Sequence, residues 1–198
     1  HDYLGVIPDL ATFGKGITNG MPLGVLAGKA EYMKELDKVF LSSTYAPEAL
    51  SLAAASANID FYKENNVIDS LWKKGEYIKE GFNNVIKNYE ISKNVSLAGY
   101  PVRLMVNTHG ADGLHDQMLA TLYQQEMFKN GILCFSGVLM LSHSHSTDDL
   151  DILISAFDSS CEVMKNALES GKQIEEFLDG VPGAPVFKGL RERNAVSN

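Results

Sequence analysis

Residues 8–29 read PDLATFGKGITNGMPLGVLAGK, and this stretch decides how the first part of the chain folds. Residues 14–24 contain four glycines and one proline, a composition typical of a loop with unusual backbone angles. The apolar segments on either side, within 4–13 and at 25–27, predict two short strands, the first of them buried. The stretch therefore predicts a lysine, Lys15, in a glycine-rich loop between two strands.

Outside this stretch, helices and strands alternate along the chain. Apolar residues at helical spacing predict helices, and short apolar runs predict strands. The predicted helices cover residues 29–36, 48–63, 67–87, 116–130 and 146–169, and the predicted strands cover 96–99, 102–106, 131–135 and 138–142. Ser146 and Asp149 have the spacing of a capping box at the start of the last helix. The alternation predicts an α/β or α+β fold, with a domain boundary between residues 63 and 70 and an irregular tail from Gly180.

The composition is that of an ordinary globular protein. The chain has 198 residues, 45% of them hydrophobic, and a formal net charge of −8, with no basic run that would favour a nucleic-acid partner. No apolar stretch is long enough to span a membrane and no signal peptide is recognisable, so a cytoplasmic location is the default expectation. Cys134 and Cys161 form no CxxC pair, which predicts two buried thiols in a reducing compartment. The chain opens at His1 without an initiator methionine, which suggests a fragment or a processed piece.

Lys15 is the residue with the clearest chemical potential. Glycines on both sides would let a flat cofactor approach, and a lysine amine attacks an aldehyde readily when its surroundings lower its pKa. The spacing alone favours a plainer interpretation, an exposed lysine in a glycine turn. The residues that follow Lys15 exclude a phosphate loop of the GxxxxGK[ST] type.

Two other groups of side chains are weaker candidates. His143 and His145 would share one face of a strand, and with Asp148 and Asp149 they could suggest a metal site, but we predict no metal there. Arg103 could hold a substrate carboxylate through a bidentate contact, although a surface or interface arginine is the commoner case.

Three stretches together resemble one family. The lysine segment at 8–29 looks like the cofactor-lysine segment of class III aminotransferases, closest in style to glutamate-1-semialdehyde aminomutases. SSTYAPEALSLAAA, at 42–55, is similar to the family's Gly-Thr-x-x-x-x-Pro-x-x-x-Ala segment, and LSHSHSTDDLDILISAF, at 141–157, is similar to its late stretch. The matches occur in family order. The chain thus resembles the carboxyl-terminal half of a class III, fold type I enzyme that depends on pyridoxal 5'-phosphate (PLP).

The resemblance implies roles for particular residues. Lys15 would form a Schiff base with PLP and then move the proton between substrate and cofactor. Ser43 and Thr44 would bind the cofactor, with Thr44 at the phosphate of the neighbouring subunit; a plain helix N-cap is the alternative for Thr44. Residues 1–66 would be the carboxyl-terminal part of the PLP-binding large domain, and 67–198 an α+β small domain with an irregular tail. The enzyme would be a cytoplasmic homodimer with shared active sites, acting on a small-molecule amino donor and a carbonyl acceptor.

Some features leave the function open. The family's Thr-x-Ser-Gly-Asn-Pro becomes TYAPEA at 44–49, so a different loop over the active site is expected. The family's other cofactor-binding residues precede the lysine and are absent here, which fits a chain that begins just after them. A racemase, epimerase or decarboxylase on the same scaffold would use the same lysine. A non-catalytic fragment or interaction module is the third possibility.

Overall fold

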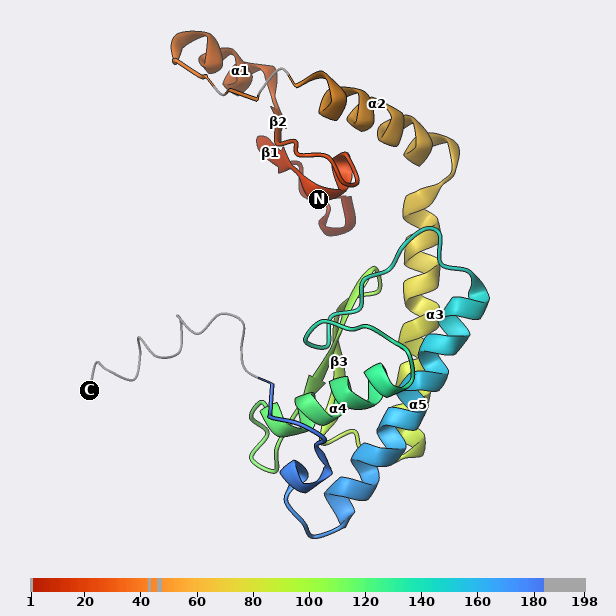
Figure 1. Cartoon of the computed structure of the whole chain (residues 1–198). Coiled ribbons are helices and arrows are strands. Elements are labelled where there is room, and N and C mark those ends of the chain that lie inside the picture. The colour runs from red at the N-terminus through yellow and green to blue at the C-terminus, as the bar shows by residue number, and fades with distance from the viewer. Residues whose placement is uncertain (1, 43, 46–47, 184–198) are drawn as a thin grey trace, which may run out of the picture. The chain divides into compact units, whose positions relative to one another are not determined.

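The structure is a computed structural model that describes residues 2–42, 44–45 and 48–183. The chain forms two compact units, His1–Ile68 and Asp69–Asn198, each of which is described by itself (Figure 1).

The first unit is built on a β-hairpin. Strand β1 (Leu10–Phe13) pairs antiparallel with β2 (Val25–Gly28), so that Leu10 lies opposite Gly28. Both predicted strands are confirmed in position, but β1 is largely exposed and the prediction that it is buried is wrong. The glycine-rich residues 14–24 connect them and place Lys15 directly after β1.

The rest of the first unit is mostly helical. The predicted helix at 29–36 forms as a short α-helix continued by a 3₁₀ helix, and the predicted helix at 48–63 is confirmed with a shift of one residue. The elements are η1 (Asp2–Leu4), η2 (Lys15–Ile17), α1 (Ala30–Met33), η3 (Lys34–Lys38) and α2 (Ala49–Glu64).

The second unit packs three long helices around another antiparallel hairpin. Figure 1 shows α3 and α5 running side by side, and ring stacking between them confirms the contact. The predicted helices and the first two predicted strands of this region are confirmed. Its elements are α3 (Val67–Asn88), which starts just before the unit, β3 (Val95–Tyr100), β4 (Arg103–Thr108), α4 (Gln117–Lys129), α5 (Thr147–Glu169) and η4 (Ile174–Phe177).

Aromatic rings form the centre of the core in this unit. Phe82 from α3 and Phe157 from α5 are fully buried, with ring centroids 3.8 Å apart and planes 1° from parallel. The ring of Tyr123, from α4, meets Phe157 edge-on with a centroid distance of 6.1 Å. The three rings therefore join the three long helices. Buried aliphatic and methionine side chains surround them, among them Ile78, Leu104, Leu119, Leu122, Met127 and Met164.

A glycine inside α3 lets the turn of the β3–β4 hairpin approach the helix. Gly75 is an interior helix position, where glycine costs about 1 kcal/mol relative to alanine. A β-carbon at Gly75 would lie 2.1 Å from the carbonyl oxygen of Pro101 in the turn. The glycine is therefore required by packing, and it brings the hairpin onto the helix.

The predicted strands at 131–135 and 138–142 are wrong. Ser136 and Gly137 have φ angles of 46° and 76°, so the chain turns sharply between the two apolar runs. The segment consequently meets β4 and itself through isolated bridges and forms no regular ladder. Apolar composition alone does not reveal this turn.

The predicted capping box at the start of α5 is confirmed. The Ser146 hydroxyl accepts from the Asp149 N–H at 3.2 Å, and the Asp149 carboxylate accepts from the Ser146 N–H at 2.7 Å. Hydrogen bonds from the Ser146 main chain and side chain lower the pKa of Asp149. The carboxylate that the sequence offered as a metal ligand is therefore engaged in holding a helix end.

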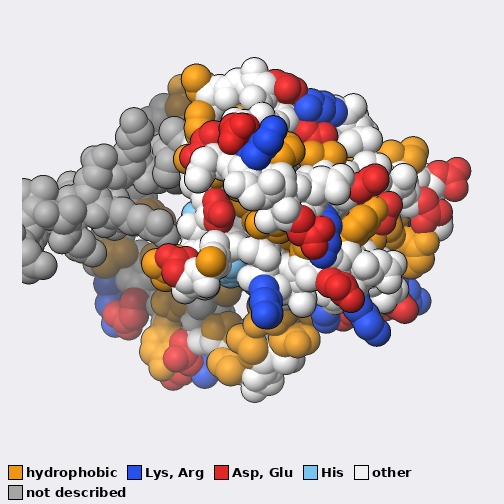
Figure 2. Space-filling model, turned by 90° about the horizontal axis from the view of Figure 1, so that it is seen from below, with side chains coloured by type: hydrophobic (Ala, Val, Ile, Leu, Met, Phe, Trp, Pro, Cys, Tyr) orange, Lys and Arg blue, Asp and Glu red, His pale blue; other side chains and the backbone are white. Residues whose placement is uncertain are grey.

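Three observations bear on the predictions from composition. Cys134 and Cys161 are free and buried, as predicted, and burial raises the pKa of each thiol. Within the described ranges, no helix combines the length and apolar character needed to cross a membrane. On the face shown in Figure 2, Lys and Arg side chains lie scattered among Asp and Glu side chains and form no single basic patch.

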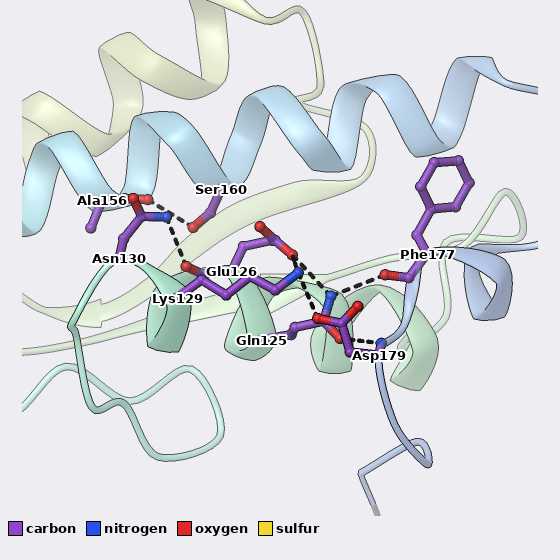
Figure 3. A network of polar contacts seen from close by, with 8 residues as sticks. All are labelled: Gln125, Glu126, Lys129, Asn130, Ala156, Ser160, Phe177 and Asp179. Atoms are coloured by element: carbon purple, nitrogen blue, oxygen red, sulfur yellow. Dashed lines mark hydrogen bonds and ion pairs between the residues drawn. The ribbon is translucent and has the colours of Figure 1, made fainter.

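The segment after α5 is tied along α4 by side chains of the helix (Figure 3). Gln125 donates to the Phe177 carbonyl at 3.0 Å and accepts from the Asp179 N–H at 2.7 Å. Lys129 lies 2.8 Å from carboxylate oxygens of both Asp179 and Glu126, and hydrogen bonds to these two carboxylates raise the pKa of Lys129. These contacts hold residues 177–179 along α4.

We expect Gln125→Ala to release this segment. It removes two hydrogen bonds to the main chain, each with a net value of about 0.5–1.5 kcal/mol. Hydrogen exchange at the Asp179 amide should therefore accelerate by roughly one decade or more. The matched control is Gln124→Ala, at the neighbouring position of α4. Equal exchange rates in the two variants would show that Gln125 does not hold this segment on α4.

Candidate functional site

The turn that carries Lys15 has an unusual backbone. Lys15 and Asn19 have φ angles of 49° and 50°, in the left-handed region that few residues other than glycine adopt. Such residues cost about 1–3 kcal/mol each and persist where the surrounding structure holds them. The backbone at Lys15 is therefore kept in place by its contacts, which distinguishes it from a lysine in a relaxed surface turn.

Hydrogen bonds within the turn hold one side of it. The Lys15 carbonyl accepts from the N–H groups of Thr18 and Asn19, both at 3.3 Å, and the Gly14 carbonyl accepts from Ile17 at 3.2 Å. Thr18 is 5% exposed, and its hydroxyl donates to the Met21 carbonyl.

A side chain from α2 holds the other side of the turn. The half-buried Asn58 donates from its side-chain Nδ2 to the carbonyls of Gly16, at 2.7 Å, and Ile17, at 3.1 Å. The carbonyls of all three residues of η2 are thus engaged. Sequence reasoning missed Asn58; the available signal was a single amide in the run of small residues that forms α2.

The amine of Lys15 is left accessible. Its side chain is exposed, and among the described residues no ion pair or hydrogen bond engages its ammonium group. Apart from Gly16 itself and its two chain neighbours, no atom lies within 4 Å of the place where a β-carbon of Gly16 would stand, and a β-carbon at Gly14 would make only an ordinary contact with the Leu23 carbonyl oxygen at 3.7 Å. The space at Gly16 is therefore open, and the accessible primary amine of Lys15 has the chemistry that an aldehyde cofactor requires.

Thr44 lies exposed in the turn before α2, and the alternative that it caps this helix is wrong. The N-cap is Glu48, whose carboxylate accepts from the N–H groups of Leu50 at 2.8 Å and Ser51 at 2.6 Å. These hydrogen bonds, those with Ser51 above all, lower the pKa of Glu48. Ser43, the other predicted cofactor ligand, lies outside the described residues, as does Pro47.

The Glu48 cap changes how an anion could be bound here. The two amides that an anion at the start of α2 would use are occupied by a carboxylate, which also repels negative charge. A phosphate contact would therefore depend on the Thr44 hydroxyl and the turn around it. Within the described part of the first unit, no hydrogen bond joins Thr44 to Lys15, and a role of Thr44 at a cofactor phosphate stays a prediction.

The remaining candidates lie in the second unit. Arg103 is exposed at the start of β4. His145 accepts from the Ser142 N–H at 3.3 Å through Nδ1, and Asp149 serves the capping box. Across residues 2–42, 44–45 and 48–183, no three His, Cys, Asp or Glu side chains gather as a metal site would require.

Comparison with known proteins defines the class of protein. The family model for class III aminotransferases matches residues 1–142. The chain therefore belongs to the class III aminotransferase family.

Relatives and solved structures agree with this membership. The chain is 29% identical to 3-aminobutyryl-CoA aminotransferase of Cloacimonas acidaminovorans, over 83% of this chain and 40% of the relative. It is 30% identical to glutamate-1-semialdehyde 2,1-aminomutase of Methanosphaera stadtmanae, over 79% of this chain and 40% of the relative. The fold matches that of the FumI protein of Sphingopyxis sp. MTA144, solved in its PLP internal aldimine form, with a TM-score of 0.77 and 19% identity over 89% of this chain and 42% of that one. The chain thus spans about 40% of the length of the curated relatives it matches.

Proposed function

We propose that the complete protein is a PLP-dependent enzyme that transfers amino groups, as an aminotransferase or an aminomutase, and that Lys15 binds the cofactor covalently. The observation that carries the proposal is the Lys15 turn. A left-handed lysine is fixed through its neighbouring carbonyls, its amine is accessible, and open space lies beside Gly16. Membership of the class III family supports the same assignment.

Bound PLP would supply an electron sink that stabilises negative charge on the substrate carbon. Lys15 would act as general base and general acid, because one mobile amine can take a proton from one carbon and return it to another. The fixed turn would keep that amine near both carbons, and Gly16 would leave room for the flat ring. The substrates would be a small amino donor and a carbonyl acceptor, as the names of relatives such as 3-aminobutyryl-CoA aminotransferase suggest for those proteins.

We also propose the domain roles and the assembly. Residues 1–66 would end the cofactor-binding domain and 67–198 would form the small domain. The working unit would be a cytoplasmic homodimer. Large apolar side chains are exposed on the first unit, and such a surface is expected to be covered by a partner subunit. The free thiols are consistent with the reducing environment of the cytoplasm. The most exposed of these apolar residues include Ile7, Phe40, Leu41 and Leu50.

The test of the function is an amino-exchange assay on the complete protein with PLP, an amine and a keto acid. We expect amino transfer that depends on Lys15. Deuterium uptake from solvent at the substrate carbon without amino exchange would instead indicate a racemase or epimerase. A protein that binds no PLP would be a non-catalytic module, and the proposal would be rejected.

Thr44→Ala is expected to weaken PLP binding while turnover at saturating cofactor is retained. In this proposal its hydroxyl donates to the cofactor phosphate held by the neighbouring subunit, and a hydrogen bond to a charged group contributes about 1.5–3 kcal/mol. The loss corresponds to roughly one to two decades in Kd. The titration of the apoenzyme with PLP measures it, with Ser56→Ala, on an exposed part of α2, as control. An unchanged affinity, or a fully active monomer in sedimentation, would contradict the shared site.

A further inference from the structure

The side chain of Asn58 makes two hydrogen bonds to the Lys15 turn. One amide nitrogen donates to two successive main-chain carbonyls, those of Gly16 and Ile17, at 2.7 and 3.1 Å. A side-chain amide carries two N–H donors on this nitrogen, so both bonds can form at once. The contact joins α2 to a turn that lies 41 and 42 residues earlier in the chain.

The sequence around Asn58 shows that packing alone does not require this amide. Its helix segment reads AAASANID, and alanine or serine fills most neighbouring positions. Asparagine is a weak helix former compared with alanine. The asparagine therefore makes the helix slightly less stable than alanine would, and this loss is offset by its two hydrogen bonds to the turn.

The two bonds hold the main chain immediately after Lys15. The residue has a φ angle of 49°, and such a conformation relaxes unless its neighbours are held. Thr18 and Asn19 hold the Lys15 carbonyl from within the turn, while Asn58 holds the next two carbonyls from outside it. Without Asn58 the inner bonds would remain, but the turn could rotate away from α2 and carry the lysine with it.

We propose that Asn58 is a positioning residue for Lys15, which fixes the direction in which the lysine amine meets its carbonyl partner. This inference rests on the proposed function, in which Lys15 binds an aldehyde cofactor. Asn58 acts through the main chain and touches neither cofactor nor substrate. A displacement of about 1 Å at a reacting group can lower a rate by about a hundredfold, so even a small relaxation of the turn has a measurable effect.

The test uses two substitutions that remove the donors in different ways. Asn58→Asp keeps the size of the side chain but sets a carboxylate against two carbonyl oxygens. Asn58→Leu removes all polarity. Asn58→Gln keeps the amide and is the rescue variant. The control is Asn65→Ala, which removes a hydrogen bond of 2.9 Å donated by the Asn65 side-chain amide to the Phe61 carbonyl at the far end of the same helix.

Two quantities are measured in the complete apoenzyme after PLP is added. One is the rate at which the visible absorbance band of the lysine-bound cofactor forms, and the other is the pH midpoint of that band. Loss of two hydrogen bonds of about 0.5–1.5 kcal/mol each corresponds to a rate roughly five- to 150-fold lower. We expect this fall, together with a displaced pH midpoint, in the Asp and Leu variants, with partial recovery in Asn58→Gln and wild-type values in Asn65→Ala.

The outcomes separate this inference from the proposed function. If wild-type protein forms no lysine-bound cofactor, the proposed function itself fails. If the wild type forms it and Asn58→Asp matches the wild type in rate and pH midpoint, the positioning role is refuted and the proposed function stands. If Asn58→Leu does not fold, the comparison of Asn58→Asp with Asn58→Gln tests the positioning role. Equal losses in Asn65→Ala would show a general weakening of α2 and would also refute the positioning role.

Discussion

Lys15→Ala is expected to lower turnover by several orders of magnitude. The substitution removes the amine that binds the cofactor and the group that moves the proton, and proton transfer alone commonly contributes about 10²–10⁴ in rate. PLP could still bind through its phosphate, so the variant should lose activity without losing all affinity. Single-turnover kinetics with an amine substrate measure the effect.

The matched control for Lys15→Ala is Lys29→Ala, in the same hairpin. Lys29 is exposed and pairs with Asp9 at 2.5 Å, and exposed pairs of this kind contribute little to stability. The Lys29→Ala variant should therefore retain nearly the wild-type rate of turnover. Loss of a catalytic acid and base is expected to leave no more than about a hundredth of the wild-type rate. If Lys15→Ala kept even about a tenth of that rate, Lys15 would not be the catalytic lysine.

Phe157→Ala is expected to destabilise the second unit by about 3–5 kcal/mol, the usual cost of removing a buried phenylalanine. Phe157 contacts Phe82 and Tyr123 and is 0% exposed. Burial of the ring and its close packing against Phe82 and Tyr123 provide the stabilisation. Since domains are stable by only about 5–15 kcal/mol, this loss is a large share.

Urea unfolding followed by circular dichroism measures the change in the free energy of unfolding. Phe128→Ala is the control, because Phe128 lies on α4 with 49% of its surface exposed. We expect a clear fall in the urea midpoint for Phe157→Ala and a small one for Phe128→Ala. Similar midpoints for the two variants would show that the stacked rings are not the centre of the core.

The sequence predicted those elements whose signals are local. Helical periodicity located α3, α4 and α5, and the spacing of Ser146 and Asp149 identified the capping box, because these patterns depend on neighbours within one or two turns. The hairpin around Lys15 was also predicted, since glycine and proline mark its loop.

Features that depend on distant contacts or on a single backbone angle were not predicted. The runs at 131–135 and 138–142 look like strands, but the left-handed Gly137 ends any ladder between them. Thr44 was one predicted cap for α2, yet the helix begins later and Glu48 caps it through the Leu50 and Ser51 amides. Asn58 stands out only as a single amide in a run of small residues, and its partners could not be predicted because they lie 41 and 42 residues earlier in the chain.

The central claim is that Lys15 binds the cofactor, and one measurement tests it most directly. The complete protein is loaded with PLP, reduced with borohydride to fix any carbon–nitrogen double bond, and digested for peptide mass spectrometry. The account predicts a reduced cofactor adduct on Lys15 within the segment FGKGITNG, at residues 13–20. An adduct on another lysine, such as Lys29, or no adduct on any peptide, would contradict it.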